Sequence, residues 1–160
     1  MHEIAVSREK KNLGHRNAAS LIRRAAEDAL RAEGIEMPCL ISVMLTDGEG
    51  IREVNREFRG IDRETDVLSF PLNELTPGAF DAALCERDPD TGEVMLGDMM
   101  ISVPRCEEQG RDFGHGYERE IMYLTVHSVL HLLGYDHVDE GAMKRQMRRR
   151  EKEIMGDEET

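Results

Sequence analysis

The feature that most constrains this chain is the run of residues from 127 to 137, which contains three of the six histidines. The stretch before it, Tyr117 to Leu133, has no glycine or proline and is apolar at most positions, so it predicts a helix buried in the core. His127 and His131 are four residues apart, which places both imidazoles on one face of that helix, one turn from each other. The sequence therefore predicts a core built around a helix that carries two histidines.

Two further residues extend this pair into a pattern that is typical of a metal site. Gly134 can adopt the left-handed conformation that ends many helices, and the chain can then turn so that His137 approaches the other two histidines. Two histidines alone would be explained more simply by packing or surface exposure, but buried imidazoles without partners cost about 1–3 kcal/mol each, and a metal removes that cost. Three nitrogen ligands with water or substrate in an open fourth position are typical of catalytic zinc. We therefore predict one zinc ion per chain on His127, His131 and His137.

The spacing of this pattern is shared with H-E-x-x-H-x-x-G-x-x-H, the zinc signature of metzincin proteases. The proteases have a glutamate after the first histidine, which takes a proton from water, whereas this chain has Ser128. A serine hydroxyl is far too weak a base for that role. A metalloprotease-like hydrolase is therefore the less favoured interpretation of the site.

Composition favours one soluble, cytoplasmic domain. The 160 residues suffice for a single core, and no stretch has the apolar length of a signal peptide or a membrane span. The three cysteines are widely spaced and form no C-x-x-C pair, as expected for free thiols in a reducing compartment. The net charge of −12 repels nucleic acid over the molecule as a whole, so contacts with RNA must be local, and neither DNA nor a membrane is expected as a partner.

Hydrophobic periodicity and turn residues predict an α+β fold: a single domain (1–160) with a small, mixed sheet of about four strands, flanked by about five helices. The predicted strands are residues 3–7, 39–46, 67–72 and 94–103. The first predicted helix runs from Asn17 to about Gly34, and a short second one ends at Gly60 with Ile51, Val54 and Phe58 on one face. A single helical turn is predicted at 105–109. The buried helix that carries the histidines follows, and the last helix runs from Asp139 to Met155. Residues 73–93 are acidic and rich in proline and glycine, which predicts an exposed, mobile loop insertion between two strands that form a hairpin.

The last predicted helix carries a basic cluster that has two interpretations. It consists of Lys144, Arg145, Arg148, Arg149 and Arg150. Cations are favoured near the C-terminus of a helix, so a solvated face explains the cluster. Attraction of RNA phosphates is the alternative explanation.

Three segments resemble the YbeY family of bacterial rRNA maturation factors. Residues 127–137 are similar to its signature H-G-x-L-H-L-x-G-Y-D-H, with Ser128 in place of the usual glycine. Residues 55–71 are similar to N-x-x-[FY]-R-x-x-D-x-x-T-D-V-L-S-F-P, and residues 96–102 resemble L-G-D-I-x-I-S. The motifs occur in the family's order, and the first 45 residues and the last 20 match only in their pattern of helices and strands.

The resemblance implies a metal-dependent hydrolase, an endoribonuclease that cuts single-stranded RNA with zinc held by His127, His131 and His137. It further implies a role in the maturation of small-subunit ribosomal RNA and in ribosome quality control. The expected partners are ribosomal RNA and, as further candidates, ribosomal proteins of the small subunit. A ribosome-assembly factor with a mainly structural zinc is the alternative from a different functional class.

Arg59 and Asp136 are the remaining candidate site residues. The resemblance places the family's conserved arginine at Arg59, and a guanidinium can hold two phosphate oxygens at once and balance charge in the transition state. The other explanation for Arg59 is a surface arginine at the end of a short helix. Asp136, next to the third histidine, is a candidate to orient a ligand imidazole. Ser128, beside the first ligand, is expected to narrow the space near the metal.

Overall fold

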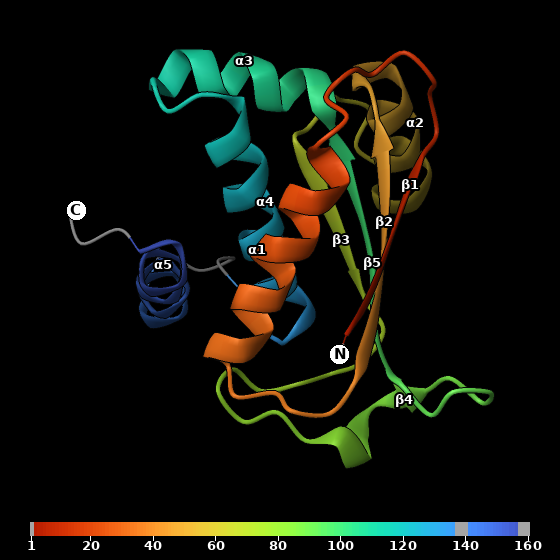
Figure 1. Ribbon diagram of the computed structural model, residues 1–160, viewed down its shortest axis with the longest axis vertical. Helices are drawn as coiled ribbons and strands as arrows, with labels where there is room; N and C mark the ends of the chain where they lie inside the picture. Colours follow the sequence, from red (N-terminus) through yellow and green to blue (C-terminus); the bar gives the residue numbers. More distant parts are fainter. Residues whose placement is uncertain (1, 137–140, 157–160) are drawn as a thin grey trace.

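A mixed β-sheet runs through the centre of the molecule, and helices cover both of its faces (Figure 1). The computed structural model describes residues 2–136 and 141–156. The strands are β1 (Glu3–Arg8), β2 (Cys39–Thr46), β3 (Val67–Pro71), β4 (Glu86–Arg87) and β5 (Val94–Ser102). The order is β1-β2-β5-β3, with β4 paired to the start of β5; β1, β2 and β5 are parallel, whereas β3 and β4 run antiparallel to β5. The predicted α+β fold with a mixed sheet is confirmed.

The described residues form five α-helices. They are α1 (Ala18–Ala32), α2 (Gly48–Arg59), α3 (Val103–Phe113), α4 (Tyr117–Leu132) and α5 (Ala142–Met155), and a short 3-10 helix, η1 (Ala82–Leu84), precedes β4. Helices α1 and α4 pack against each other, α3 crosses one end of α4, and α5 lies beside α4 on the side away from the sheet (Figure 1). Within residues 2–136 and 141–156, no helix combines the length and the apolar character that crossing a membrane requires.

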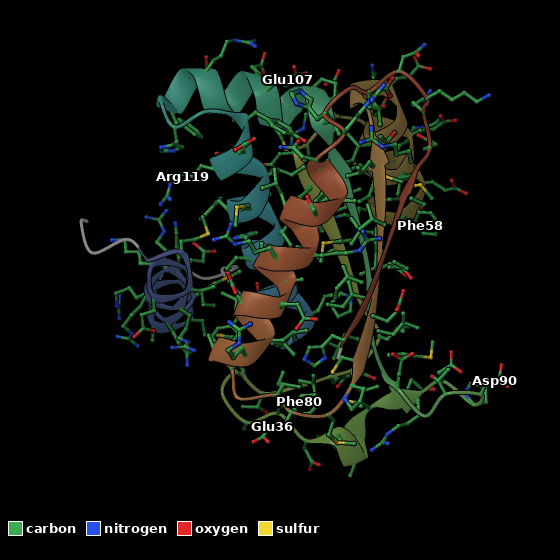
Figure 2. The ribbon with its side chains drawn as sticks, viewed as in Figure 1. Glu36, Phe58, Phe80, Asp90, Glu107 and Arg119 are labelled. Atoms are coloured by element: carbon green, nitrogen blue, oxygen red, sulfur yellow. The ribbon has the colours of Figure 1, made fainter. Side chains whose placement is uncertain are left out.

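Successive side chains of a strand point to opposite faces of the sheet, so neighbouring residues of β3 contact different helices. The Ser69 hydroxyl lies 2.6 Å from the Ser128 hydroxyl of α4. The next residue, Phe70, meets the ring of Phe58 of α2 edge-on, with 5.9 Å between the ring centroids. Helices α4 and α2 therefore cover opposite faces of the sheet, and Figure 2 shows Phe58 on the side of the sheet away from α4.

Helix α4 is buried on most of its surface, as its sequence predicts. Its fully buried apolar residues include Ile121, Val129, Leu130 and Leu132. They belong to the same core cluster as the buried residues of α1 and of strands β2 and β5. The histidine helix therefore runs through the centre of the domain, and the side chains that it carries are held by a close-packed core.

Two predictions about α2 and α5 are corrected by the structure. The spacing of Ile51 and Phe58 predicts that both lie on one inward face of α2. Ile51 is buried, but Phe58 lies in the last turn of the helix and is 68% exposed. Arg150 does not point freely into solvent: its guanidinium pairs with Glu33, which caps the end of α1, and with Glu153. Asp139, the predicted first residue of the last helix, lies outside the described residues, and α5 has Gly141 at its N-cap.

Helix α3 is longer than the single turn that the sequence predicts at residues 105–109. Pro104 occupies the first turn of this helix, where a fixed φ and a missing N–H are tolerated, so it starts the helix as well as ending β5. Gly110, expected in a flexible approach to α4, lies inside α3. A Cβ atom at Gly110 would lie 2.5 Å from the carbonyl carbon of Gly116, so glycine is needed there for α3 and the start of α4 to pack closely.

Candidate active site

A hollow of about 420 Å³ brings together most of the predicted site residues. It is lined by Arg59 at the end of α2, His127 and His131 of α4, Asp136 after α4, and residues 65–69, which include the start of the edge strand β3. Arg59 and the histidines are far apart in sequence and are supplied by helices on opposite faces of the sheet. The remaining candidate, His137, lies outside the described residues.

The two histidines of α4 are arranged as their spacing predicts. Their ring centroids are 4.7 Å apart, and the ring planes are inclined at 77°. The His127 side chain is 20% exposed, and it lines both this hollow and a second one beside Glu151. Among residues 2–136 and 141–156, no three His, Cys, Asp or Glu side chains converge as a metal cluster, so the three-histidine ligand set stays a prediction.

Glu151 is a site residue that sequence reasoning missed. It lies on α5 with only 5% of its surface exposed, and its Oε2 is 2.5 Å from Nδ1 of His127. Its Oε1 accepts a hydrogen bond of 2.8 Å from the Tyr123 hydroxyl. Burial and the adjacent Glu151 carboxylate raise the pKa of Tyr123, which keeps this hydroxyl protonated as a donor. A signal existed in the sequence: Glu151 follows the buried Met147 by one helical turn and therefore shares its inward face.

The contact with Glu151 determines which nitrogen of His127 can bind a ligand. An ionised carboxylate has only acceptor oxygens, so with Glu151 ionised Nδ1 of His127 carries the proton of this hydrogen bond. In the neutral imidazole the other nitrogen, Nε2, then keeps its lone pair. Metal-binding histidines commonly have such a partner on the second nitrogen. The chemistry of the His127 environment thus fits a zinc ligand.

Arg59 is positioned by the end of α2. The next residue, Gly60, has φ +71° and ends the helix by donating its N–H to Arg56. Arg52, two turns earlier on α2, pairs with Asp62 at 2.8 Å, whereas within the described parts of the chain Arg59 has no ion-pair partner within 4 Å. Arg59 therefore brings a guanidinium without an ion pair to the hollow that the histidines, Asp66 and Asp136 also line.

Ser128 does not itself line the hollow, although its hydrogen-bond partner Ser69 does, and its effect on the space near the metal stays a prediction. It is fully buried, and its hydroxyl is hydrogen-bonded to Ser69 on β3. Its direction follows from helical geometry, because adjacent residues of a helix point about 100° apart. The side chain that replaces the family's glycine is therefore satisfied by the sheet.

The turn after α4 is tightly packed. Gly134 has φ +104°, and a Cβ atom there would lie 2.2 Å from the carbonyl oxygen of Leu75, so only glycine fits. The predicted left-handed residue at the end of the helix is thus confirmed. Asp136, two residues later, is half-buried and lines the hollow, and its orienting role stays a prediction.

Comparisons with known proteins agree with the fold and with the sequence motifs. The family model of endoribonuclease YbeY matches residues 3–158. The endoribonuclease YbeY of Clostridium kluyveri is 45% identical over 141 residues, which cover 84% of this chain and 85% of the relative. That of Clostridium acetobutylicum is 46% identical over 146 residues and covers 87% of each chain. The solution structure of TM1509 from Thermotoga maritima has a TM-score of 0.56 and 28% identity, and the match covers 96% of this chain and 90% of that one.

The family model matches nearly the whole length of this chain. This chain therefore belongs to the endoribonuclease YbeY family and is a hydrolase.

Proposed function

We propose that this protein is a zinc-dependent endoribonuclease specific for single-stranded RNA. We further propose that it acts in the cytoplasm, in the maturation of small-subunit ribosomal RNA and in ribosome quality control. The observation that carries the proposal is the presence of Arg59, His127 and His131 around one hollow. This combination joins a phosphate-binding cation to metal-binding nitrogens, which is what hydrolysis of a phosphodiester requires.

Zinc is the metal that suits the donor set. His127 and His131 would supply imidazole nitrogens from one helix face, and His137 would supply the third. When bound, zinc lowers the pKa of a coordinated water and polarises a phosphoryl oxygen. Glu151 would accept a hydrogen bond from Nδ1–H of His127, which would leave the lone pair of Nε2 for the metal.

Arg59 would bind the phosphate of the scissile bond. Its guanidinium offers two parallel N–H donors to two phosphate oxygens and remains charged at every working pH. Charge on those oxygens grows in the transition state, so the contact strengthens as the reaction proceeds. The chain as a whole has a net charge of −12, so binding to RNA should depend on this local charge and weaken at modest salt concentrations.

The metal site is tested by elemental analysis. The wild-type protein should contain one zinc ion per chain, and His131→Ala should lose it, because two remaining ligands bind zinc poorly. Far-UV circular dichroism must show that the variant is folded. Full zinc content in His131→Ala would contradict the proposed ligand set.

The proposed activity is tested by RNA cleavage at low ionic strength, with ribosomal RNA and ribosomal particles as substrates. Arg59→Ala should keep its zinc but lose about 100- to 1000-fold in cleavage rate, and Arg59→Lys should recover only part of it. Arg56→Ala is the matched control, because Arg56 lies one turn earlier on α2 and lines a different hollow. Unfolded casein should remain intact.

The comparison of variants from identical preparations excludes contaminating nucleases. Equal cleavage by wild type, Arg59→Ala and His131→Ala would contradict the nuclease assignment. A zinc-containing wild type without RNA cleavage would instead favour a ribosome-assembly factor with a mainly structural zinc. Loss of cleavage in Arg56→Ala as large as in Arg59→Ala would show that only general positive charge matters.

A further inference from the structure

We propose that Glu151 is a positioning residue for the metal site: it fixes the tautomer and the ring orientation of His127 so that Nε2 points to the metal. This inference rests on the proposed zinc site but concerns a residue of α5, which contributes none of the predicted ligands. It would make α5 a functional part of the site.

The first support is the burial of the Glu151 carboxylate. Its side chain is 6% exposed, and burying a carboxylate without partners is costly. It accepts hydrogen bonds from Nδ1 of His127 at 2.5 Å and from the Tyr123 hydroxyl at 2.8 Å, each on a different oxygen. The carboxylate is therefore held at both oxygens, and its plane cannot turn without breaking one of the two bonds.

The second support is the geometry of α4. Tyr123 and His127 are one helical turn apart, so their side chains leave the same face of α4, and their ring centroids are 6.0 Å apart. Glu151 bridges both from α5. The core holds α4 and the two hydrogen bonds hold the carboxylate, so the contact between Nδ1 of His127 and Glu151 favours the ring orientation that the structure shows.

The third support is the chemistry of imidazole tautomers. A neutral histidine in water carries its proton mainly on Nε2, which would block the nitrogen that faces away from Glu151. An acceptor at Nδ1 reverses this preference and leaves Nε2 unprotonated. Without it, the protein would have to change the tautomer, or turn the ring, each time that a metal binds.

The chain offers a matched control in Glu33. The Glu33 side chain is 5% exposed and also accepts a 2.8 Å hydrogen bond from a tyrosine hydroxyl, that of Tyr135. It also attaches α5, because it pairs with Arg150. Among the described residues, its side chain bonds to Tyr135 and Arg150 and to no histidine, so replacing it tests loss of a buried carboxylate without a change at His127.

The experiment measures zinc affinity by competition with a chromophoric chelator in wild type, Glu151→Leu, Glu151→Gln, Tyr123→Phe and Glu33→Leu. Glu151→Leu should bind zinc about 10- to 100-fold more weakly. Glu151→Gln should remain within about tenfold of wild type, because the amide oxygen still accepts from Nδ1–H. Tyr123→Phe should have a smaller effect than Glu151→Leu, and Glu33→Leu should keep wild-type affinity even if it unfolds at lower temperature.

A second readout does not depend on bound metal. Long-range ¹⁵N–¹H correlation spectra of the metal-free full-length protein should show His127 with its proton on Nδ1 in wild type and Glu151→Gln. In Glu151→Leu the proton should move to Nε2. Cobalt-loaded proteins provide a third comparison, since a displaced His127 changes the ligand-field spectrum.

The possible outcomes separate this inference from the proposed function. Zinc affinity in Glu151→Leu equal to that of wild type, or an unchanged His127 tautomer, would overturn the positioning role while leaving the zinc site intact. Equal losses in Glu151→Leu and Glu33→Leu would also overturn it, because the effect would then be general destabilisation. A wild type that binds no zinc would contradict the proposed metal site, and the tautomer spectra would still decide whether Glu151 controls His127.

Discussion

Two glutamates with buried side chains, Glu33 and Glu151, attach α5 to the rest of the domain, and each accepts one hydrogen bond from a tyrosine hydroxyl and another from a nitrogen. Glu33, at the end of α1, accepts from the Tyr135 hydroxyl and from Arg150 of α5. Glu151, on α5, accepts from the Tyr123 hydroxyl and from Nδ1 of His127. Both tyrosine bonds are 2.8 Å long, so the second partner is what distinguishes the two sites.

The two nitrogen partners give the glutamates different roles: Glu33 only attaches α5, whereas Glu151 also positions the ring of His127. The guanidinium of Arg150 is always charged and has only donors, so its pairing with Glu33 compensates a buried negative charge and does nothing further. The imidazole of His127 has a second nitrogen, and a proton donated from Nδ1 to Glu151 makes that nitrogen the acceptor of the ring. A carboxylate bonded to arginine thus serves stability, whereas one bonded to histidine also controls the chemistry of the partner.

A third glutamate, the buried Glu120 of α4, extends the comparison because, among the described residues, no arginine or histidine is hydrogen-bonded to it. It is 3% exposed, and burial, followed by the negative charge of Asp66, raises its pKa. With its amide nitrogen turned toward the carboxylates, Gln109 donates to Glu120 at 2.8 Å and to Asp66 at 3.3 Å. An amide compensates less charge than an arginine does, which agrees with the raised pKa.

The largest expected effect comes from breaking the arginine pair. Arg150→Leu would leave the Glu33 carboxylate buried with Tyr135 alone and should lower the free energy of unfolding by about 3 kcal/mol. This is the lower end for a buried pair, because Arg150 is itself 25% exposed. Urea denaturation measures the change, and Arg149→Leu, at the exposed adjacent position, is the control. Loss of zinc from folded Arg150→Leu would contradict the separation of attachment from positioning.

A smaller effect, with a defined pH dependence, is expected at Glu120. Because its folded-state pKa is raised, the stabilising contribution of this carboxyl is fully present below its ordinary pKa of 4.5 and is lost as the pH rises through the folded-state value. Glu120→Gln keeps the shape of the protonated form and should raise the free energy of unfolding at pH 7 by about 1 kcal/mol. The gain should disappear near pH 4, as thermal unfolding at the two pH values would show. An equal gain at both would mean that the buried charge is not its cause.

The smallest expected effect concerns the outer face of α5. Arg148 lines a second hollow of about 260 Å³ together with His127 and Glu151, whereas the adjacent Arg149 does not. Arg148→Gln should therefore slow RNA cleavage about threefold at low salt, as expected for an exposed charge contact, and Arg149→Gln should not. The two variants have the same net charge. Equal rates would favour a solvated face as the explanation of the basic cluster.

The sequence predicts most of the fold because the relevant signals are local. An uninterrupted apolar stretch specifies α4, and apolar runs bounded by turn residues specify β2 and β5. Pro104 was misleading because proline can end a strand and begin a helix with the same backbone geometry, so α3 was predicted too short. Strand β4 has only two residues and carries no periodic signal.

The site is less predictable because it is assembled by tertiary packing. The His127 and His131 pair follows from helical spacing, but the proximity of Arg59 came from the family resemblance, since no local pattern links α2 to α4. Glu151 was missed because an acidic residue in a charged helix is normally exposed. Only the packing of α5 against α4 reveals that this glutamate faces inward, next to His127.

The contact between Gly134 and Leu75 indicates which part of the connection between β3 and β5 can accept inserted residues. The Leu75 carbonyl packs against the turn after α4, so residues added before Leu75 would displace the backbone next to the histidines. Further along the same connection, the turn with Asp90 projects away from the domain (Figure 2), closed by a bond from Asp88 N–H to the Glu93 carbonyl. Doubling the length of a flexible loop costs only about 0.6 kcal/mol in closure entropy. A fluorescent or affinity tag inserted at Asp90 should therefore leave the α4 turn in place, which makes this position suitable for attaching the protein to a surface.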